Sequence, residues 1–217
     1  MNRISASHYY ALAAVAAVYI LIILISPSGF WIIDEGNKFL WAENLIREGS
    51  FVLENQADDI SPGHSAFKEP FSVPAPDGSG EITIFSPLFI ALLALFAAGG
   101  LKAALILPAI VSLLLIIAAG KLAGKLNLPF SPLTVILLGL ISPLLFYSVT
   151  LWEHGLAVLL AIAGINLALG DRNRGIFAGV LFAFAAYIRP EILIVIFFIW
   201  LLLIERRRWY IVIGGVF

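Results

Sequence analysis

The chain has 217 residues, of which 61% are hydrophobic and only 12% charged, and its mean hydropathy is +1.02. This composition excludes an ordinary water-soluble globular domain, because such a domain could not hide so much apolar surface. The net charge of −1 and the lack of a basic stripe give no support to a nucleic-acid partner, and the absence of cysteine excludes disulfides and thiolate metal sites.

The first apolar run covers residues 10–25 and follows Arg3. It could be a signal peptide or a retained first span. No small-x-small cleavage site follows it, and Trp31 suits a membrane interface. We therefore expect it to stay in the protein as a membrane helix.

Residues 27–84 carry ten of the 14 acidic residues and only three basic ones. Within this segment, residues 35–48 have helical periodicity that ends at Gly49, which predicts an amphipathic helix on the outer leaflet. Residues 50–80 are rich in Pro, Gly, Ser and Asp, which predicts a loop.

The next apolar stretch, residues 87–98, is about 18 Å long as a helix and therefore too short for a hydrocarbon core of about 30 Å. We expect a re-entrant or interfacial half-helix that ends at Gly99 and Gly100. Further apolar stretches predict the later spans: 101–119, 130–150, 155–169, 175–188 and 192–204. The last two are separated by Arg189, Pro190 and Glu191.

The positions of lysine and arginine predict the orientation, because basic residues near span ends mark the cytoplasmic side. If residues 87–98 do not cross, all the basic turns share one side: Arg3, Lys121, Lys125, Arg172, Arg174 and Arg206 to Arg208. The N-terminus is then cytoplasmic, and the first loop, 27–100, is extracytoplasmic. The sequence thus predicts an all-α, polytopic membrane protein with one membrane domain over 1–217, about six transmembrane helices, and juxtamembrane or re-entrant helices in its first outer loop.

Asp34 and Glu35 follow the first span almost at once. Two carboxylates at a membrane surface could act as a general base and a ligand for metal or substrate. The alternative is that Asp34 only caps the surface helix while Glu35 favours its positive end.

Two more charged groups are predicted on the same outer face. Glu153 and His154 could form an acid/base pair or, with Asp34, hold a divalent metal; the alternative is that Glu153 only starts the next helix. Arg189 and Glu191 interrupt an apolar stretch, where Arg189 could hold a lipid phosphate or simply pair with Glu191. Three such groups on one face suggest a common site.

Two lysines complete the set of candidates. Lys38, on the surface helix, is a candidate for substrate binding. Lys68, in the loop, could reach the site, although a solvated loop charge is the alternative.

In order and spacing these motifs resemble the N-terminal half of a GT-C fold glycosyltransferase, of the protein-mannosyltransferase and lipid A aminoarabinose-transferase type. The motifs are Asp34-Glu35-Gly36 with Lys38 and Trp41, then Phe85-Ser86-Pro87-Leu88-Phe89, then Ser142 to Ser148 before Trp152-Glu153-His154. Each motif is short, and together they cover nearly the whole chain.

The resemblance implies a polyprenyl-phosphate-linked sugar as donor, an inverting transfer on the outer face, and Asp34 as base or acceptor-positioning residue with Glu35 beside it. Glu153 matches the acidic position of the second outer loop, with His154 as its companion, and Arg189 has positional similarity to donor-phosphate contacts. Such enzymes are longer, so we expect this chain, which ends within an apolar run at Phe217, to be a portion of one. Two alternatives remain: a non-catalytic subunit that binds lipid-linked sugar or a partner complex, and a transporter or flippase.

Overall fold

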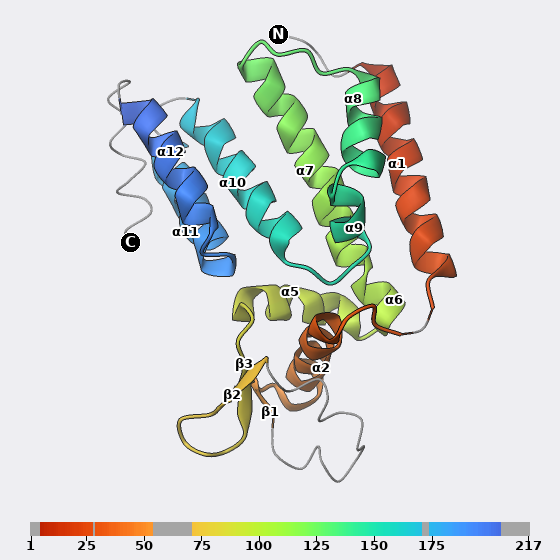
Figure 1. Ribbon diagram of the computed structural model, residues 1–217, viewed down its shortest axis with the longest axis vertical. Helices are drawn as coiled ribbons and strands as arrows, with labels where there is room; N and C mark the ends of the chain where they lie inside the picture. Colours follow the sequence, from red (N-terminus) through yellow and green to blue (C-terminus); the bar gives the residue numbers. More distant parts are fainter. Residues whose placement is uncertain (1–4, 28, 54–70, 171–173, 205–217) are drawn as a thin grey trace. The chain divides into compact units, whose positions relative to one another are not determined.

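The structure is a computed structural model that describes residues 5–27, 29–53, 71–170 and 174–204. It is mainly helical, as predicted, and adds one small sheet that was not predicted (Figure 1). Contacts divide the chain into two compact units: unit 1 is Met1–Leu21, Pro108–Ser148 and Glu153–Phe217, and unit 2 is Ile22–Leu107 and Val149–Trp152. The following residues named above lie outside the described part: Arg3, Lys68, Arg172 and Arg206 to Arg208.

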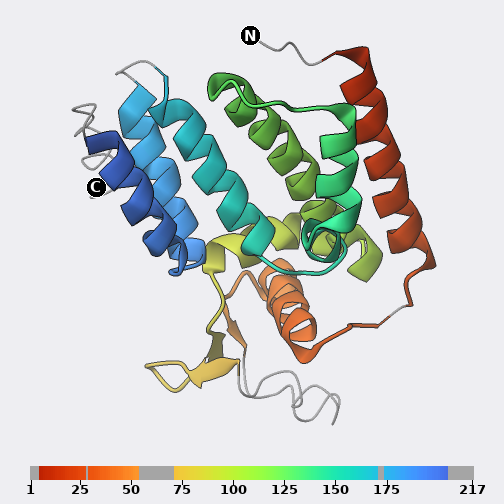
Figure 2. The same cartoon turned by 45° about the horizontal axis from the view of Figure 1, so that its top comes forward.

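The elements of unit 1 in the described residues are all helices, and α10, α11 and α12 lie side by side (Figures 1 and 2). α10 and α11 approach closely at Gly164, where a Cβ atom would lie only 2.7 Å from Cε1 of the buried Phe182 ring. The bounds of α11 and α12 are those predicted, with the break at Pro190. The helices are α1 (Ala6–Ile25), α7 (Ile106–Lys125), α8 (Pro132–Ile136), the π-helical η1 (Leu137–Ile141), α9 (Leu144–Ser148), α10 (His154–Ala168), α11 (Gly175–Ile188) and α12 (Ile192–Ile204).

The prediction of one continuous span over residues 130–150 is wrong. The helix that begins with α8 continues as the π-helical η1 and ends at Ser142, whose backbone is extended with ψ 167°. Pro143 explains the break, because proline lacks an N–H group and disfavours a helical conformation in the residue before it. The chain resumes as the short helix α9, so that neither piece has the length of a span.

α1 is tied to the π-helical segment by a buried hydrogen bond. The Tyr19 hydroxyl donates to the backbone carbonyl of Gly139 at 2.9 Å. In a continuous α-helix that carbonyl would accept from residue 143, which is proline and has no N–H to give. Gly139 also leaves no room for a Cβ atom, which would lie 2.6 Å from Cγ1 of Val15.

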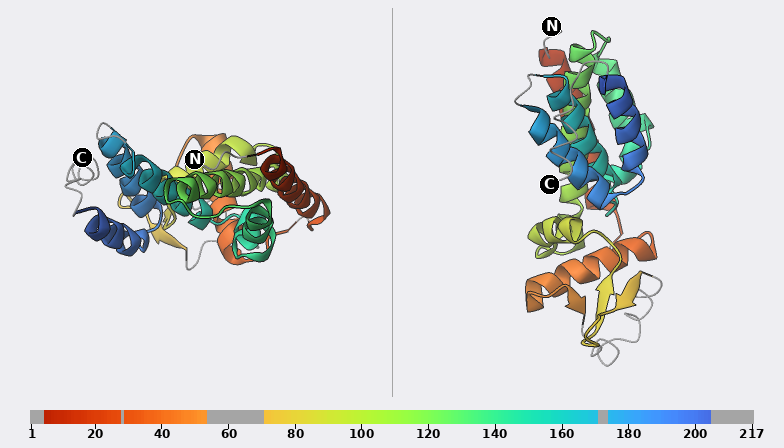
Figure 3. Two further views of the ribbon diagram at one scale, coloured as in Figure 1. Left: turned by 90° about the horizontal axis from the view of Figure 1, so that it is seen from above. Right: turned by 90° about the vertical axis from the view of Figure 1, so that its left-hand side faces the viewer.

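In unit 2, α2 (Ile33–Glu48) contacts α5 (Pro87–Ala97), β1 and β3 (Figure 3, right). The helix predicted over residues 35–48 is confirmed, and it ends as predicted at Gly49, which has a φ of 66° and donates its N–H to the Leu45 carbonyl. Its place on the outer leaflet stays a prediction. Two polar residues of this amphipathic helix, Asn37 and Lys38, are fully buried. The short helix α6 (Leu101–Ala104) follows α5 after Gly99 and Gly100.

The described part of the predicted loop contains strands. β1 (Val52–Leu53), β2 (Ser72–Pro74) and β3 (Glu81–Thr83) form an antiparallel sheet in the order β1-β3-β2. The turn residues that suggested a loop instead join β2 to β3: Gly78 has a φ of 72°, and the Asp77 carboxylate accepts the N–H of Ser79. The Ser79 bonds also hold the pKa of Asp77 below its usual value.

Two of the described helices are long and apolar enough to cross a membrane by length and composition: Ala6–Ile25 and Leu101–Lys125. The other apolar helices of this kind are shorter: Pro87–Ala97, Pro132–Ile141, His154–Ala168 and Gly175–Ile188. Membrane association is supported to this extent. The count of about six spans and their orientation stay predictions.

Candidate functional site

Asp34 lies inside the first turn of α2 and does not cap it, because Ile32 occupies the N-cap position. The capping alternative for Asp34 is therefore wrong. Its side chain is 19% exposed, and one carboxylate oxygen, Oδ2, lies 3.0 Å from Nζ of Lys38. Asp34 thus presents a carboxylate that is partly open to solvent and fixed on one side by a cation.

The lysine that pairs with Asp34, Lys38, is buried inside unit 2. Its side chain is 1% exposed, so the ammonium is enclosed by protein, and its predicted contact with substrate stays a prediction. Its Nζ lies 4.3 Å from the centroid of the Phe85 ring and 5.7 Å from that of Trp152. These aromatic faces stabilise a cation that has left water.

Glu35, the next residue of α2, is 2% exposed. Its Oε2 accepts the backbone N–H of Trp31 at 2.8 Å, and its Oε1 accepts that of Leu151 at 2.9 Å. Burial raises the pKa of Glu35, while the backbone donors and the charge of Lys38 act against this rise. Predicted as a catalytic residue, Glu35 is placed by these bonds as the connection between α2 and Val149–Trp152.

Phe85 and Trp152 were not predicted as site residues. Each belongs to a motif named in the sequence, Phe85 to Phe85-Ser86-Pro87-Leu88-Phe89 and Trp152 to Trp152-Glu153-His154, but neither was assigned a role. The presence of an aromatic ring in those motifs is a signal in the sequence, but their shared contact with Lys38 depends on the fold of unit 2.

In unit 1 the guanidinium of Arg189 gathers the second and third predicted groups. Its Nη1 donates to Oε1 of the buried Glu153 at 3.0 Å, and its Nη2 donates to Nε2 of His154. Its Nε lies 2.7 Å from a carboxylate oxygen of Glu191. The sequence predicted these residues as separate pairs on one face; the structure brings them into one cluster, at the start of α10 and the end of α11.

His154 has two neighbours in this cluster. A guanidinium has only donors, so the Nε2 atom of His154 is the acceptor in its contact with Arg189. The ring also stacks on Tyr147, with centroids 5.1 Å apart and planes inclined by 10°. His154 therefore stands between an arginine and an aromatic ring.

Glu191 lies at the exposed turn between α11 and α12, with 53% of its side chain accessible. Its own backbone N–H and then the charge of Arg189 hold the pKa of Glu191 below its usual value, against the small effect of burial. The two roles predicted for Arg189, pairing with Glu191 and binding a lipid phosphate, are both compatible with this position. The ion pair with Glu191 uses the Nε edge of the guanidinium.

The three residues predicted as metal ligands are divided between the units: Asp34 belongs to unit 2, whereas Glu153 and His154 belong to unit 1. The sequence Trp152-Glu153-His154 is divided in the same way, after Trp152. Within either unit's described residues, no three acidic or histidine side chains come together to hold a metal ion.

Comparison with protein families, with curated proteins and with solved structures gives no match. Two separate candidate groups therefore rest each on its own geometry: a carboxylate paired with a lysine in unit 2, and a cluster around an arginine in unit 1.

Proposed function

We propose that this chain is all or part of an integral membrane glycosyltransferase, which moves a sugar from a polyprenyl-phosphate carrier to an acceptor on the extracytoplasmic face. The observation that carries the proposal is the environment of Asp34. Its carboxylate is partly exposed, whereas its neighbour Glu35 and its partner Lys38 are enclosed by protein. Such a transfer requires a base that substrate can reach and whose orientation is fixed by a neighbouring group.

In the proposed reaction the acceptor oxygen attacks the anomeric carbon of the donor sugar. The bond from that carbon to the phosphate oxygen breaks with inversion, and polyprenyl phosphate leaves with the electron pair. Asp34 takes the proton that the acceptor loses, or holds the acceptor in line. Lys38 keeps the carboxylate in one orientation, which lowers the entropic cost of reaching the reactive geometry.

Arg189 is the candidate for the departing phosphate. Its guanidinium carries five N–H groups, and the contacts to Glu153, His154 and Glu191 use three directions of the fork. The remaining donors suit a phosphate oxygen, which binds guanidinium more strongly than a neutral acceptor does. Glu153, which accepts a hydrogen bond from Arg189, is then a positioning residue for the guanidinium.

The test compares Asp34→Asn with Asp77→Asn, a matched change of acid to amide at an exposed turn of the same unit. Each variant of the full-length protein is returned to cells that lack the gene, and mass spectrometry measures lipid-linked sugars and glycoconjugates. We expect Asp34→Asn to lower transfer about 100-fold or more, the usual effect of removing a general base. Asp77→Asn should restore wild-type products.

Normal glycoconjugates in cells with Asp34→Asn, at wild-type protein levels, would remove the assignment. A non-catalytic subunit predicts a different pattern, in which lipid-linked sugar is retained by the wild type but no product depends on Asp34. A flippase predicts that the sidedness of the lipid-linked sugar changes while the amount of product made from externally added donor does not.

A further inference from the structure

The ring of Tyr147 belongs to the cluster around Arg189, but neither the sequence nor the proposed reaction gives it a role. Tyr147 lies on α9 and stacks on the imidazole of His154, with ring centroids 5.1 Å apart and planes inclined by 10°. Nε2 of the same imidazole accepts from Nη2 of Arg189. The aromatic ring, the imidazole and the guanidinium therefore contact one another in sequence, and all three belong to unit 1.

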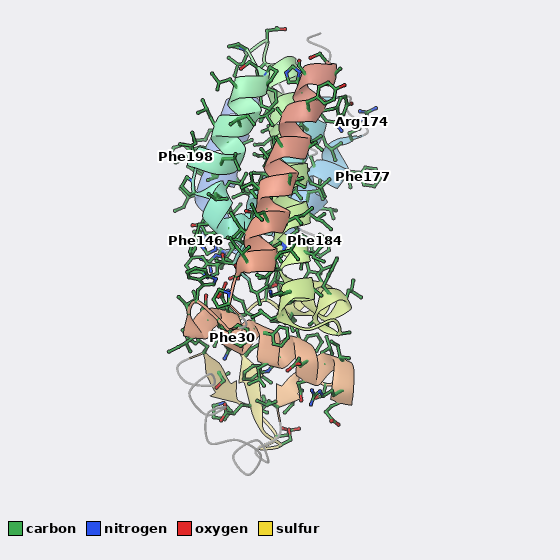
Figure 4. All side chains as sticks on the ribbon, turned by 90° about the vertical axis from the view of Figure 1, so that its right-hand side faces the viewer. Phe30, Phe146, Arg174, Phe177, Phe184 and Phe198 are labelled. Atoms are coloured by element: carbon green, nitrogen blue, oxygen red, sulfur yellow. The ribbon has the colours of Figure 1, made fainter. Side chains whose placement is uncertain are left out.

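The break at Pro143 begins the short helix α9 anew and so determines where Tyr147 lies. On this helix Leu144 and Ser148 are buried, whereas Phe146 is 46% exposed on the outer surface of unit 1 (Figure 4). Tyr147 is half-buried between these two sides, where α9 contacts α10. The interruption of the apolar run thus places an aromatic ring against the first residue of α10.

This stack restrains a torsion of His154 that is otherwise soft. The last torsion of a histidine side chain joins an sp³ carbon to an sp² carbon and has broad minima. Rotation about it would move Nε2 out of line with Arg189, because the lone pair of that nitrogen lies in the plane of the ring. The ring of Tyr147, packed nearly parallel to the imidazole, opposes the rotation.

Arg189 depends on such restraints because its side chain is long and 28% exposed. Its Nη1 donates to Oε1 of Glu153 at 3.0 Å, and its Nη2 donates to His154. A guanidinium is planar, so fixing these two nitrogens also fixes the directions of its other N–H groups.

We propose that Tyr147 is a positioning residue for the phosphate of the lipid carrier. It holds the imidazole of His154, and through the imidazole it holds the guanidinium of Arg189 in the orientation that binds phosphate. This inference rests on the role proposed above for Arg189. Glu153 acts on the guanidinium by charge, whereas Tyr147 acts by contact between rings, so phenylalanine should replace it.

The experiment measures binding of undecaprenyl phosphate and of undecaprenol to the full chain in phosphatidylcholine nanodiscs, by native mass spectrometry. Undecaprenol has the same chain without the phosphate, so a loss confined to undecaprenyl phosphate reports on the anion contact and not on the fold. The variants are Tyr147→Leu, Tyr147→Phe, His154→Ala and the double variant Tyr147→Leu with His154→Ala. Tyr10→Leu is the matched control, since Tyr10 is 76% exposed on α1.

We expect Tyr147→Leu to weaken binding of undecaprenyl phosphate about three- to tenfold, the effect of losing one aromatic contact, and to leave binding of undecaprenol unchanged. Tyr147→Phe and Tyr10→Leu should bind both lipids like the wild type. In the double variant Tyr147→Leu should add little to the loss caused by His154→Ala, because Tyr147 acts through His154.

Unchanged binding of undecaprenyl phosphate in Tyr147→Leu would overturn the inference, and so would a full further loss in the double variant. An equal loss of undecaprenol would assign Tyr147 to the fold instead, and an equal loss in Tyr147→Phe would assign the effect to the hydroxyl. A wild type that binds both lipids equally would remove the phosphate role of Arg189 together with this inference. A wild type that prefers undecaprenyl phosphate, with no change in Tyr147→Leu, would remove this inference alone.

Discussion

Nη1 of Arg189 donates a 3.0 Å hydrogen bond to Oε1 of Glu153, across 36 positions of sequence. The bond joins Arg189, which directly follows α11, to Glu153, which directly precedes α10. Glu153 is 2% exposed and Arg189 is 28% exposed, so each charge depends on the other for much of what water would otherwise supply. This pair holds the charged cluster of unit 1 together.

The pair predicts strong coupling between Glu153→Gln and Arg189→Gln. Glu153→Gln removes one of the two acids that pair with Arg189, and Arg189→Gln removes the cation beside the buried Glu153, whereas the double variant removes both charges of this pair. We expect the double variant to lose less stability than the sum of the singles, with a coupling of about 1 to 3 kcal/mol from thermal unfolding in detergent. The exposed pair Arg47 and Glu43, 3.9 Å apart, is the control and should couple by less than about 0.5 kcal/mol. Additive effects at Glu153 and Arg189 would show that the bond contributes nothing.

Glu35 predicts a dependence of stability on pH. Its folded-state pKa lies above the ordinary value of 4.5, so the stability it contributes is complete below that value. This contribution is lost as the pH rises through the folded-state pKa, because the buried group must then carry a charge. Glu35→Gln should flatten this part of the curve, measured as the free energy of unfolding against pH.

Glu35→Gln should also cost about 1 to 3 kcal/mol at low pH, because the amide nitrogen cannot accept one of the two backbone N–H groups. Glu48→Gln, at the exposed end of the same helix, is the matched control and should keep the wild-type slope. A wild-type slope in Glu35→Gln as well would assign the pH dependence to other groups.

The close approach of α10 and α11 at Gly164 predicts that adding a single methyl group there lowers stability. A Cβ there would lie 2.7 Å from the Phe182 ring, so Gly164→Ala should lower stability by about 1 to 3 kcal/mol. Gly124→Ala on α7 meets nothing within 4 Å and should be neutral or stabilising, because alanine favours a helix. The melting temperature of each variant checks this, and Phe182→Leu should rescue part of the loss. No difference between the two alanine variants would contradict the close packing of α10 on α11.

The orientation can be tested directly because the chain has no cysteine. Ser79→Cys, at the exposed turn between β2 and β3, should react with an impermeant maleimide on intact cells. Lys121→Cys should react only after the membrane is opened, since its basic segment is predicted to be cytoplasmic. The reverse pattern, or reaction of both from one side, would contradict the predicted orientation and with it the extracytoplasmic site.

Several elements could be predicted from the sequence because a local signal marks them. The bounds of α11 and α12 follow from Pro190 and its charged neighbours, which interrupt a long apolar run. The end of α2 follows from Gly49, which adopts the left-handed conformation that glycine tolerates. In each case one or two residues determine where the helix stops.

Other features depend on contacts between distant residues and could not be predicted in this way. The buried carboxylate of Glu35 accepts a hydrogen bond from the backbone N–H of Leu151, and no pattern around residue 35 indicates that distant partner. The strands β2 and β3 are short and contain polar residues, so their pairing, not their composition, defines them. The break at Pro143 has a local signal in the proline itself, but the apolar run around it predicts one continuous span.

The bond from Tyr19 to Gly139 restricts how α1 can slide along its neighbour. A shift of one helical turn, about 5.4 Å, would strand a hydroxyl and a carbonyl among apolar side chains, at a cost of several kcal/mol. Val15 fits only against a residue without a side chain, so a sliding helix would also meet larger neighbours of Gly139. Movement of α1 along its own axis is therefore disfavoured, whereas a small tilt that keeps the bond from Tyr19 to Gly139 is compatible with these contacts.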